Sequence, residues 1–370
     1  MKILFITNIP SRYRMDFFNE LGKTQDVKVI FEAETAPQIN SNWYSADIIN
    51  FEAVFLKKGD IEERKIDWKV LKQIKRKTQD VIVLTSYAYF TEMLALIYLK
   101  LIKIPYYLEV DGGIIKIEKR LKKWYKTFLV SNAYGYISPS KQTDDFFAYY
   151  GAKKEKIRRY PFTSLKKADV LSDVLNCEEK QILRREIGIK EEKVILSVGQ
   201  YIYRKGYDIL LNGIVEIDKN YGVYIIGGDN PTNEYIELVD KFNLTNVHFI
   251  SFKTKEDLKK YYKAADLFVL PTREDIWGLV INEAMAYGLP VVTTEKCLAG
   301  LELVKDNENG FIVPVEDAKQ LAEKMTAILS DDVLRASMGK KSLDIIREYT
   351  IEKMASRHIE IFNNYENELK

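Results

Sequence analysis

The sequence predicts an α/β protein of two domains, each built around a parallel β-sheet. Short apolar and β-branched runs alternate along the chain with segments of helical periodicity, which is the pattern of βα units. The chain has 370 residues, more than one hydrophobic core normally supports. The apolar runs also form two series, one on each side of a stretch near residue 160, and we place the domain boundary there.

The expected strands follow from these runs. In the first half they are Lys2–Thr7, Val27–Phe31, Val81–Leu84, Tyr106–Val110 and Gly135–Ser138. In the second half they are Lys193–Val198, Gly222–Ile226, Val247–Ile250, Asp266–Leu270, Pro290–Thr293 and Gly310–Val313. The segment Tyr160–Ser164 is a candidate linker, and a charged helical segment, Ala168–Ile189, leads into the second sheet. Helices fill the chain from Val315 onward, and the last is expected over Ile351–Leu369.

Composition limits the class of protein. Hydrophobic residues make up 46% of the chain and charged residues 30%, as in globular proteins. Two cysteines, Cys177 and Cys297, provide no disulfide framework and indicate a reducing, cytoplasmic setting. The segment Met1–Thr7 carries one charge and suits a first strand better than a secretion signal. Charges and a proline interrupt the apolar segment Val81–Leu108, which predicts strand, helix and strand instead of a membrane span.

The two halves differ in charge. Residues 1–165 contain 28 Lys and Arg against 19 Asp and Glu, whereas the remainder contains 28 against 35. The halves are therefore expected to meet different partners, and no nucleic acid is expected among them.

Two carboxylates stand eight residues apart, at Asp275 and Glu283. The first lies on a loop, 271–278, that follows an apolar strand, and the second lies about one turn inside a helix expected over Leu279–Tyr287. This spacing is the main clue to function. The alternative is a loop and helix that only pack, with Glu283 as a solvated charge.

The residues between the two acids suit the approach of an anion. A Trp277-Gly278 turn precedes the helix, and Gly278 lets backbone come close to a ligand. The helix start at Leu279 and Val280 offers unpaired N–H groups and the positive end of the helix dipole.

A second loop, from Gly199 to Asp208, also follows a strand and precedes a helix, the usual place for ligands in open α/β sheets. Its cations, Arg204 and Lys205, can neutralise a diphosphate and make a nucleotide a better leaving group without a metal. The alternative is a solvated turn in which neither cation has a specific role.

Both motifs are similar to those of family 4 retaining glycosyltransferases, which have the GT-B fold. In the E-x7-E signature of that family, the first acid holds hydroxyls of the donor sugar and the second holds the ribose diol of the nucleotide. Here Asp275 and Glu283 fall at those positions. Asp275 is one methylene shorter than the usual Glu, so the preceding Glu274 is an alternative sugar ligand.

The phosphate-binding loop of the family commonly has an Arg after its first glycine and a Lys before its second. Lys205-Gly206 matches this pattern, whereas Gln200, after Gly199, occupies the Arg position. Adjacent Arg204 can supply the missing charge.

Further positions match the family less closely. Gly227 corresponds to a glycine-rich turn near the nucleotide, or it is a plain turn. Phe252 and Lys253 fall where backbone atoms of the family read the base. Arg12 and Arg14 lie on the loop after the first strand, where they can hold an anionic acceptor or be surface charges.

Histidine is scarce, since the chain has only two, neither in the first half. Many family 4 enzymes have a His after the strand that here runs over Pro105–Val110, and this chain has Asp111-Gly112-Gly113 instead. Asp111, with Gly112 beside it, can orient the donor sugar or the acceptor hydroxyl; alternatively it caps the following helix. The scarcity of His argues against a His/Cys metal site and a Ser-His-Asp hydrolase. The absence of Asp-x-Asp from the sequence argues against the metal-dependent GT-A class.

An amphipathic helix is expected over Lys116–Leu129. Its apolar residues are Ile117, Leu121, Trp124, Tyr125, Phe128 and Leu129, and its basic residues are Lys116, Lys119, Arg120, Lys122, Lys123 and Lys126. Such a helix can lie on anionic lipid, with Trp124 at the interface. Alternatively, the apolar stripe covers the core and the lysines face water.

The resemblance implies a GT-B fold, that is, two Rossmann-like domains with a cleft between them and a C-terminal helix that crosses back. Residues 1–164 would bind the acceptor, residues 165–345 the nucleotide sugar, and residues 346–370 would form the returning helix. The expected activity is retaining transfer of a hexose from a UDP-sugar to a saccharide or lipid-linked acceptor, as in bacterial surface-polysaccharide assembly. No metal or other cofactor is expected, and the location is the cytoplasm or the inner face of the membrane.

Five residues are the expected catalytic group: Lys205, Arg204, Asp275, Glu283 and Asp111. In the mechanism favoured for the family, the departing phosphate oxygen takes the proton of the acceptor, so no enzyme base is needed. Two rival functions stay open at this point. One is a nucleotide-sugar epimerase of the same fold, and the other is a non-catalytic partner subunit, which Asp275 and Gln200 would permit.

Overall fold

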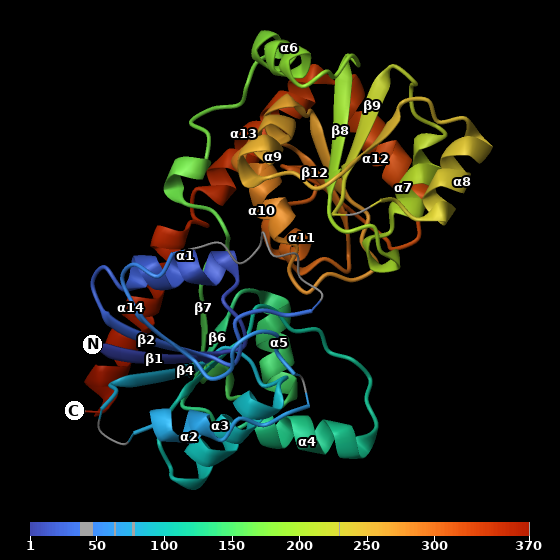
Figure 1. Ribbon diagram of the computed structural model, residues 1–370. Helices are drawn as coiled ribbons and strands as arrows, with labels where there is room; N and C mark the ends of the chain where they lie inside the picture. The colour runs from blue at the N-terminus through green and yellow to red at the C-terminus, as the bar shows by residue number, and fades with distance from the viewer. Residues whose placement is uncertain (38–46, 63, 76–77, 229, 370) are drawn as a thin grey trace. The chain divides into compact units, whose positions relative to one another are not determined.

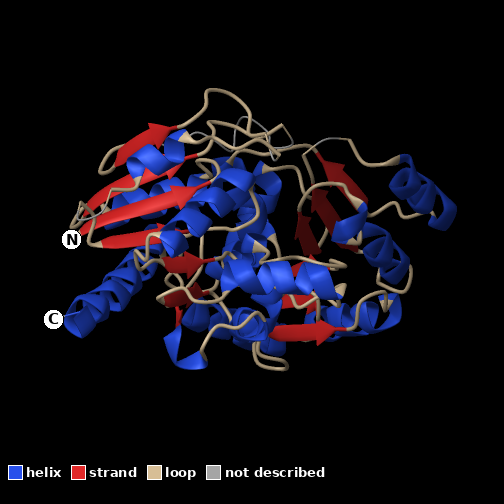
Figure 2. Ribbon diagram, turned by 90° about the horizontal axis from the view of Figure 1, so that it is seen from below, coloured by secondary structure: helices blue, strands red, loops and turns tan. Residues whose placement is uncertain are grey.

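The computed structural model describes residues 1–37, 47–62, 64–75, 78–228 and 230–369 (Figure 1). The chain divides into two compact units. Unit 1 consists of Met1–Ser164 together with Thr350–Lys370, and unit 2 consists of Leu165–Tyr349. Each unit has one parallel β-sheet with helices packed on it (Figure 2). The predicted α/β class with two parallel sheets is therefore confirmed.

The sheet of unit 1 has the strand order β3-β2-β1-β4-β5-β6-β7, and all its neighbours are parallel. The strands are β1 (Lys2–Thr7), β2 (Asp26–Phe31), β3 (Glu52–Phe55), β4 (Val81–Leu84), β5 (Tyr107–Glu109), β6 (Gly135–Ser138) and β7 (Ile157–Arg159). The sequence did not predict β3 and β7. Both are edge strands without a fully buried residue, so they lack the continuous apolar run that marks the central strands.

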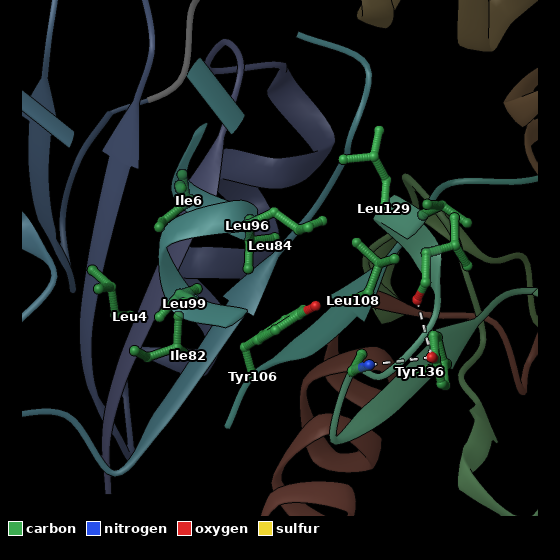
Figure 3. Packing of buried hydrophobic residues seen from close by; sticks show 14 of the residues in the cluster. Leu4, Ile6, Ile82, Leu84, Leu96, Leu99, Tyr106, Leu108, Leu129 and Tyr136 are labelled. Atoms are coloured by element: carbon green, nitrogen blue, oxygen red, sulfur yellow. Dashed lines mark hydrogen bonds between the residues drawn. The ribbon is translucent and has the colours of Figure 1, made fainter. Parts of the chain in front are cut away.

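The helices of unit 1 are α1 (Arg12–Leu21), α2 (Lys69–Gln73), α3 (Phe90–Leu101), α4 (Arg120–Val130), α5 (Lys141–Tyr149) and α14 (Ile351–Leu369). Because successive strand residues point to opposite faces of a sheet, the strands contribute to two cores. On one face Leu4 and Ile6 of β1 belong to a cluster with Leu96 and Leu99 of α3 (Figure 3). On the other face, where α1 and α14 pack together, Phe5 contacts the aromatic rings of α1.

The sheet of unit 2 has the order β10-β9-β8-β11-β12-β13, again all parallel. Its strands are β8 (Lys193–Val198), β9 (Tyr221–Ile226), β10 (Val247–Ile250), β11 (Leu267–Leu270), β12 (Val291–Thr294) and β13 (Gly310–Val313). All six were predicted to within about one residue. The direction of the strand order reverses between β8 and β11. The loops that leave these two neighbouring strands therefore mark the switch point at which open α/β sheets bind ligands.

The helices of unit 2 are α6 (Cys177–Glu186), α7 (Tyr207–Ile214), α8 (Asn233–Phe242), α9 (Lys255–Ala264), α10 (Leu279–Ala286), α11 (Leu298–Leu303), α12 (Ala318–Ser330) and α13 (Asp332–Ile346). The predicted helical segment Ala168–Ile189 is wrong in its first half. A short 3₁₀ turn, Lys167–Asp169, and a loop precede α6, which begins where Asn176 caps it by accepting the N–H of Glu179.

In the segment after β5, the expected helix start at Lys116 and the alternative in which Asp111 caps that helix are both wrong. The helix predicted from Lys116 begins four residues later, at Arg120, so Asp111 does not cap it. The carboxylate of Asp111 instead accepts hydrogen bonds from Tyr13 and Arg14, which removes it from a capping role.

Among the described residues, no helix combines the length and the apolar character needed to cross a bilayer.

Candidate functional site

Two loops of unit 2 meet at the switch point of its sheet. One joins β8 to α7 and the other joins β11 to α10. The carbonyl oxygen of Arg204, on the first loop, accepts hydrogen bonds from the Thr272 hydroxyl and the Arg273 N–H of the second, both at 2.8 Å. These bonds fix the backbones of the two predicted motifs to each other.

The close approach of the loops requires a glycine. Gly206 has a φ of +69°, and a Cβ added to it would lie 2.1 Å from the carbonyl oxygen of Pro271. A side chain at this position would be strained by the left-handed backbone and would also push the second loop away. The glycine after Lys205 is therefore what allows the two loops to touch.

A buried ion pair connects the loops. Nζ of Lys205 lies 2.6 Å from Oδ2 of Asp275, and the two side chains are only 11% and 12% exposed. Arg204 approaches the same carboxylate, with 3.4 Å between Nη1 and Oδ1, and donates to the carbonyl oxygen of Glu274 at 2.7 Å. The structure thus brings together Lys205, Arg204 and Asp275, so that two cations share one carboxylate.

The backbone of Asp275 is held from its other side. Its N–H donates to the carbonyl of Lys296 at 2.9 Å, and its carbonyl accepts from the N–H of Leu298. Nearby, the thiol of Cys297 donates to the carbonyl of Trp277. Burial, and then the charge of Asp275, raise the pKa of Cys297 to about 12, so this thiol stays protonated at neutral pH. The loop is fixed on both sides of the acid.

Trp277 supports this loop from within the core. Its side chain is buried, and the indole N–H donates to Oδ1 of Asn282 at 2.9 Å. Gly278, with a φ of +100°, follows it and precedes the first residues of α10, Leu279 and Val280. The N-cap has no side chain to accept their N–H groups, so the start of α10 presents backbone donors beside the ion pair.

The second acid of the motif, Glu283, lies one turn into α10 and is half-buried. Its Oε2 accepts a hydrogen bond of 2.9 Å from the hydroxyl of Tyr262, on α9. Burial, and then the charge of Glu283, raise the pKa of Tyr262 well above its usual value. Tyr262 therefore remains a donor at neutral pH and fixes the orientation of this carboxylate.

The remaining predicted donor residues lie at the same carboxyl edge of the sheet, because all its strands are parallel. Gly227 follows β9 and packs against the ring of Tyr201, whose atoms a Cβ would approach to 2.2 Å. The Tyr201 hydroxyl donates to carbonyls at the ends of β9 and β10. Gln200 is exposed, and Phe252 and Lys253, after β10, are half-buried. Asp229, in the turn after Gly227, lies outside the described residues.

Unit 1 contains a different polar cluster, between the first turn of α1 and the end of β5. Arg12 and Arg14, which were predicted on the loop after the first strand, lie in α1 instead. Nη2 of Arg14 donates to Asp111 at 2.7 Å, and the hydroxyl of Tyr13 donates to the other oxygen of the same carboxylate. Burial raises the pKa of Asp111, although the charge of Arg14 opposes this effect. Arg14 is buried and therefore not a surface charge, whereas Arg12 is exposed; Gly112 adjoins Asp111 in the loop after β5.

A histidine of α14 extends this cluster. Nε2 of His358 lies 3.2 Å from Glu109, whose other oxygen is 3.8 Å from Arg14. Burial alone would raise the pKa of Glu109, but the hydrogen bond and charge of His358 and the charge of Arg14 outweigh it and lower the pKa. The cluster is thus a network of mutually paired groups in which Arg14, Glu109 and His358 are buried, whereas Asp111 is half-buried.

Comparison with known proteins identifies the family. Residues 179–344, which contain both loops of unit 2, match the model of the family described as glycosyl transferases group 1. An uncharacterized 41.2 kDa protein in the cps region of Klebsiella pneumoniae is 30% identical over 263 residues, 66% of this chain and 67% of the relative. The chain belongs to the group 1 glycosyl transferases.

The name of a further relative states an activity. The N,N'-diacetylbacillosaminyl-diphospho-undecaprenol α-1,3-N-acetylgalactosaminyltransferase of Campylobacter jejuni is 21% identical over 273 residues, 70% of this chain and 71% of that protein. Other curated glycosyltransferases match over 42% to 49% of their own length, so the chain spans about half the length of these relatives.

The fold of this group 1 chain also resembles solved structures. Anabaena HepE in complex with UDP has a TM-score of 0.78 and 18% identity, with 98% of this chain and 100% of that chain covered. At this identity the likeness shows the fold alone, and it confirms the predicted GT-B fold.

Sequence reasoning did not find several residues of the polar clusters in unit 1 and unit 2. Tyr262 and Tyr13 orient predicted acids, and Glu109 and His358 complete the network around Arg14. Arg273 forms a two-point ion pair with Asp208, 2.8 and 2.6 Å, that helps to hold the second loop. Only His358 carried a signal, since a single histidine among the apolar positions of a helix is typical of a buried, paired side chain.

Among the described residues, no group of three or more His, Cys, Asp or Glu side chains is arranged to hold a metal ion.

We predict that Gly206→Ala destabilises this group 1 glycosyl transferase much more than Gly188→Ala. Both glycines have left-handed backbones, with φ of +69° and +76°, but a Cβ at Gly188 meets nothing within 4 Å. The control variant, Gly188→Ala, should lose about 1 kcal/mol of unfolding free energy, because a side chain strains the left-handed backbone. Gly206→Ala should lose at least about 3 kcal/mol, because the loops must also separate. Thermal unfolding measures both losses, and equal losses would contradict the close contact described here.

Proposed function

We propose that this protein is a retaining glycosyltransferase that moves a sugar from a nucleotide diphosphate sugar, with UDP as the nucleotide, to a hydroxyl of a saccharide or lipid-linked acceptor. The observation that carries this proposal is the cluster of Lys205, Arg204 and Asp275 beside the start of α10. Family membership supports it. The UDP complex of the similar HepE structure supports the choice of nucleotide.

The cations would act on the diphosphate. When the bond between the sugar and the phosphate breaks, negative charge accumulates on the departing nucleotide. Lys205 and Arg204, with the N–H groups at the start of α10, form a fixed positive environment that would stabilise this charge more than that of the bound donor. The buried position of Lys205 strengthens the effect, because little water screens it.

The carboxylates would hold the hydroxyls of the donor. Asp275 lies against Lys205, so a sugar hydroxyl bound by Asp275 would be close to the leaving phosphate. We therefore assign the sugar contact to Asp275 and not to Glu274. Glu283, oriented by Tyr262, would accept hydrogen bonds from the ribose diol.

The reaction needs no basic residue of the enzyme. The acceptor oxygen forms a bond with the anomeric carbon while the bond from that carbon to the phosphate oxygen breaks on the same face. The proton of the acceptor hydroxyl moves to the departing phosphate oxygen, so the products are the glycoside and the nucleoside diphosphate. The configuration at the anomeric carbon is retained.

Unit 1 would bind the acceptor through Asp111, Gly112 and the exposed Arg12. Tyr13 and Arg14 orient the Asp111 carboxylate, so their role would be to position it. The Campylobacter relative acts on a sugar carried by diphospho-undecaprenol, as its name states. This name supports a lipid-linked acceptor. With such an acceptor we propose a role in surface-polysaccharide assembly at the inner face of the membrane.

Substitution of the donor residues tests the proposal. Lys205→Ala and Glu283→Ala should each lower transfer at least about a hundredfold, the scale of losing a group that acts on developing charge. Lys205→Ala should mainly reduce kcat, and Glu283→Ala should also raise KM for the donor. Asp275→Ala should be similarly severe and Glu274→Ala mild. Transfer is measured with UDP-sugars and a soluble acceptor analogue.

Exposed residues of the same types provide the controls. Lys219→Ala and Glu237→Ala should leave activity within a few-fold of the native protein. Native-like activity in both Lys205→Ala and Glu283→Ala would refute the donor site. Turnover of the sugar nucleotide without any acceptor would indicate an epimerase instead.

Activity should persist in EDTA, because the cations of Lys205 and Arg204 would neutralise the diphosphate without a divalent ion. The measurement is transfer after dialysis against the chelator, with and without added Mg²⁺ or Mn²⁺. Loss of activity that either ion restores would refute the metal-independent mechanism.

A further inference from the structure

Helix α4 turns an apolar stripe toward solvent. Leu121, Trp124, Tyr125 and Phe128 are spaced at i, i+3, i+4 and i+7, so they lie on one side of the helix. Leu121 is 82% exposed and Trp124 67%, and the other two are more than 40% exposed. The helix is anchored to unit 1 by its last two residues, 129 and 130, which are buried. The core-covering alternative is therefore wrong for most of the stripe.

Neighbouring residues enlarge this surface. Ile117, in the segment just before α4, is fully exposed, and Leu101, at the end of α3, is 75% exposed. Helices α3 and α4 pack together (Figure 1), with a contact of 3.0 Å from the Tyr125 hydroxyl to Sδ of Met93. Leu101 follows Lys100, whose Nζ donates to the carbonyl of residue 129 at 2.9 Å. The exposed apolar residues thus come from adjacent elements of one unit.

The stripe is surrounded by positive charge. Residues 116–129 contain six basic side chains and one acid, Glu118. Glu118 pairs with Lys126 at 2.7 Å and with Lys122 at 3.4 Å, so it offsets only part of that charge. Lys123 lies over the ring of Tyr149, 3.8 Å from its centroid. An apolar stripe with an exposed tryptophan and flanking lysines matches the surface of an anionic bilayer, which presents phosphate above hydrocarbon.

We propose that α4 and residues 115–119 dock unit 1 onto an anionic lipid bilayer, with Leu121, Trp124 and Phe128 inserted at the boundary of headgroups and acyl chains. The basic side chains contact lipid phosphates. The biological role of this docking rests on the proposed function, because docking would bring the acceptor-binding unit to a lipid-linked acceptor. The docking itself is independent of catalysis.

Sedimentation with vesicles tests the docking. The protein should pellet with vesicles of phosphatidylcholine and phosphatidylglycerol at low salt, and less as salt rises, because the lysine contribution is screened. It should stay in solution with phosphatidylcholine alone. Leu121→Ser combined with Trp124→Ser should lower binding at least about tenfold through lost apolar burial. Val333→Ser, which changes an equally exposed residue of α13, should have no effect.

A charge variant tests the contribution of the basic residues around the apolar stripe. Lys119→Glu combined with Lys122→Glu should lower binding to anionic vesicles at least about tenfold, since each basic residue near the surface contributes about 1 kcal/mol. Lys153→Glu combined with Lys154→Glu makes the same change in charge on another exposed part of unit 1 and should have a much smaller effect. Equal effects of the two pairs would show only general electrostatic attraction and overturn the assigned surface.

The remaining outcomes separate docking from catalysis. Failure to pellet with either vesicle overturns the docking, as does a dimer in solution that Trp124→Ser abolishes, because the stripe would then bind a second copy. Stabilisation by UDP in a thermal-shift assay should be unchanged in the docking variants. Vesicle binding without any transfer would refute the proposed function alone, and transfer to a soluble acceptor without vesicle binding would refute the docking alone.

Discussion

The buried ion pair between Lys205 and Asp275 is the interaction on which the candidate site depends. Removing two charges from water is costly, and only good geometry and further hydrogen bonds offset that cost. Here the distance of 2.6 Å, the approach of Arg204 and the backbone bonds on both sides of Asp275 provide them. The pair therefore fixes a cation at the switch point of the sheet before any ligand arrives, so little reorganisation would accompany charge development.

The two units use buried charge differently. In unit 2, two cations share one carboxylate beside a helix start, so the cluster retains positive character that suits a phosphate. In unit 1, Arg14 is matched by Asp111 and Glu109, and His358 adds a second partner for Glu109. That network connects α14 to the end of β5. Its proposed contribution to binding is to orient the carboxylate of Asp111. The contrast supports the proposed assignment of donor binding to unit 2 and acceptor binding to unit 1.

Sequence reasoning succeeded where the signal was local. The buried strands, the helix after Gly278 and the placement of Lys205 and Asp275 at strand ends all follow from short patterns. Sequence reasoning failed where the partner or the exposure of a side chain depends on residues that are distant in the sequence. Tyr13 and Arg14 take the carboxylate of Asp111 from 97 or more residues away, and no local pattern reveals that α4 turns its stripe outward. Glu92 is a further example: in the mostly apolar helix α3 it is fully buried, and burial raises its pKa to about 8.

The most direct test of the account compares UDP with uridine by isothermal titration calorimetry, using the native protein and Lys205→Met. The two ligands differ only in the diphosphate, which the account places against Lys205. The substitution should weaken UDP binding about ten- to a hundredfold, as expected for the loss of a charge-assisted hydrogen bond worth about 1.5–3 kcal/mol, and leave uridine binding unchanged. Unchanged affinity for UDP, or an equal loss for both ligands, would contradict it.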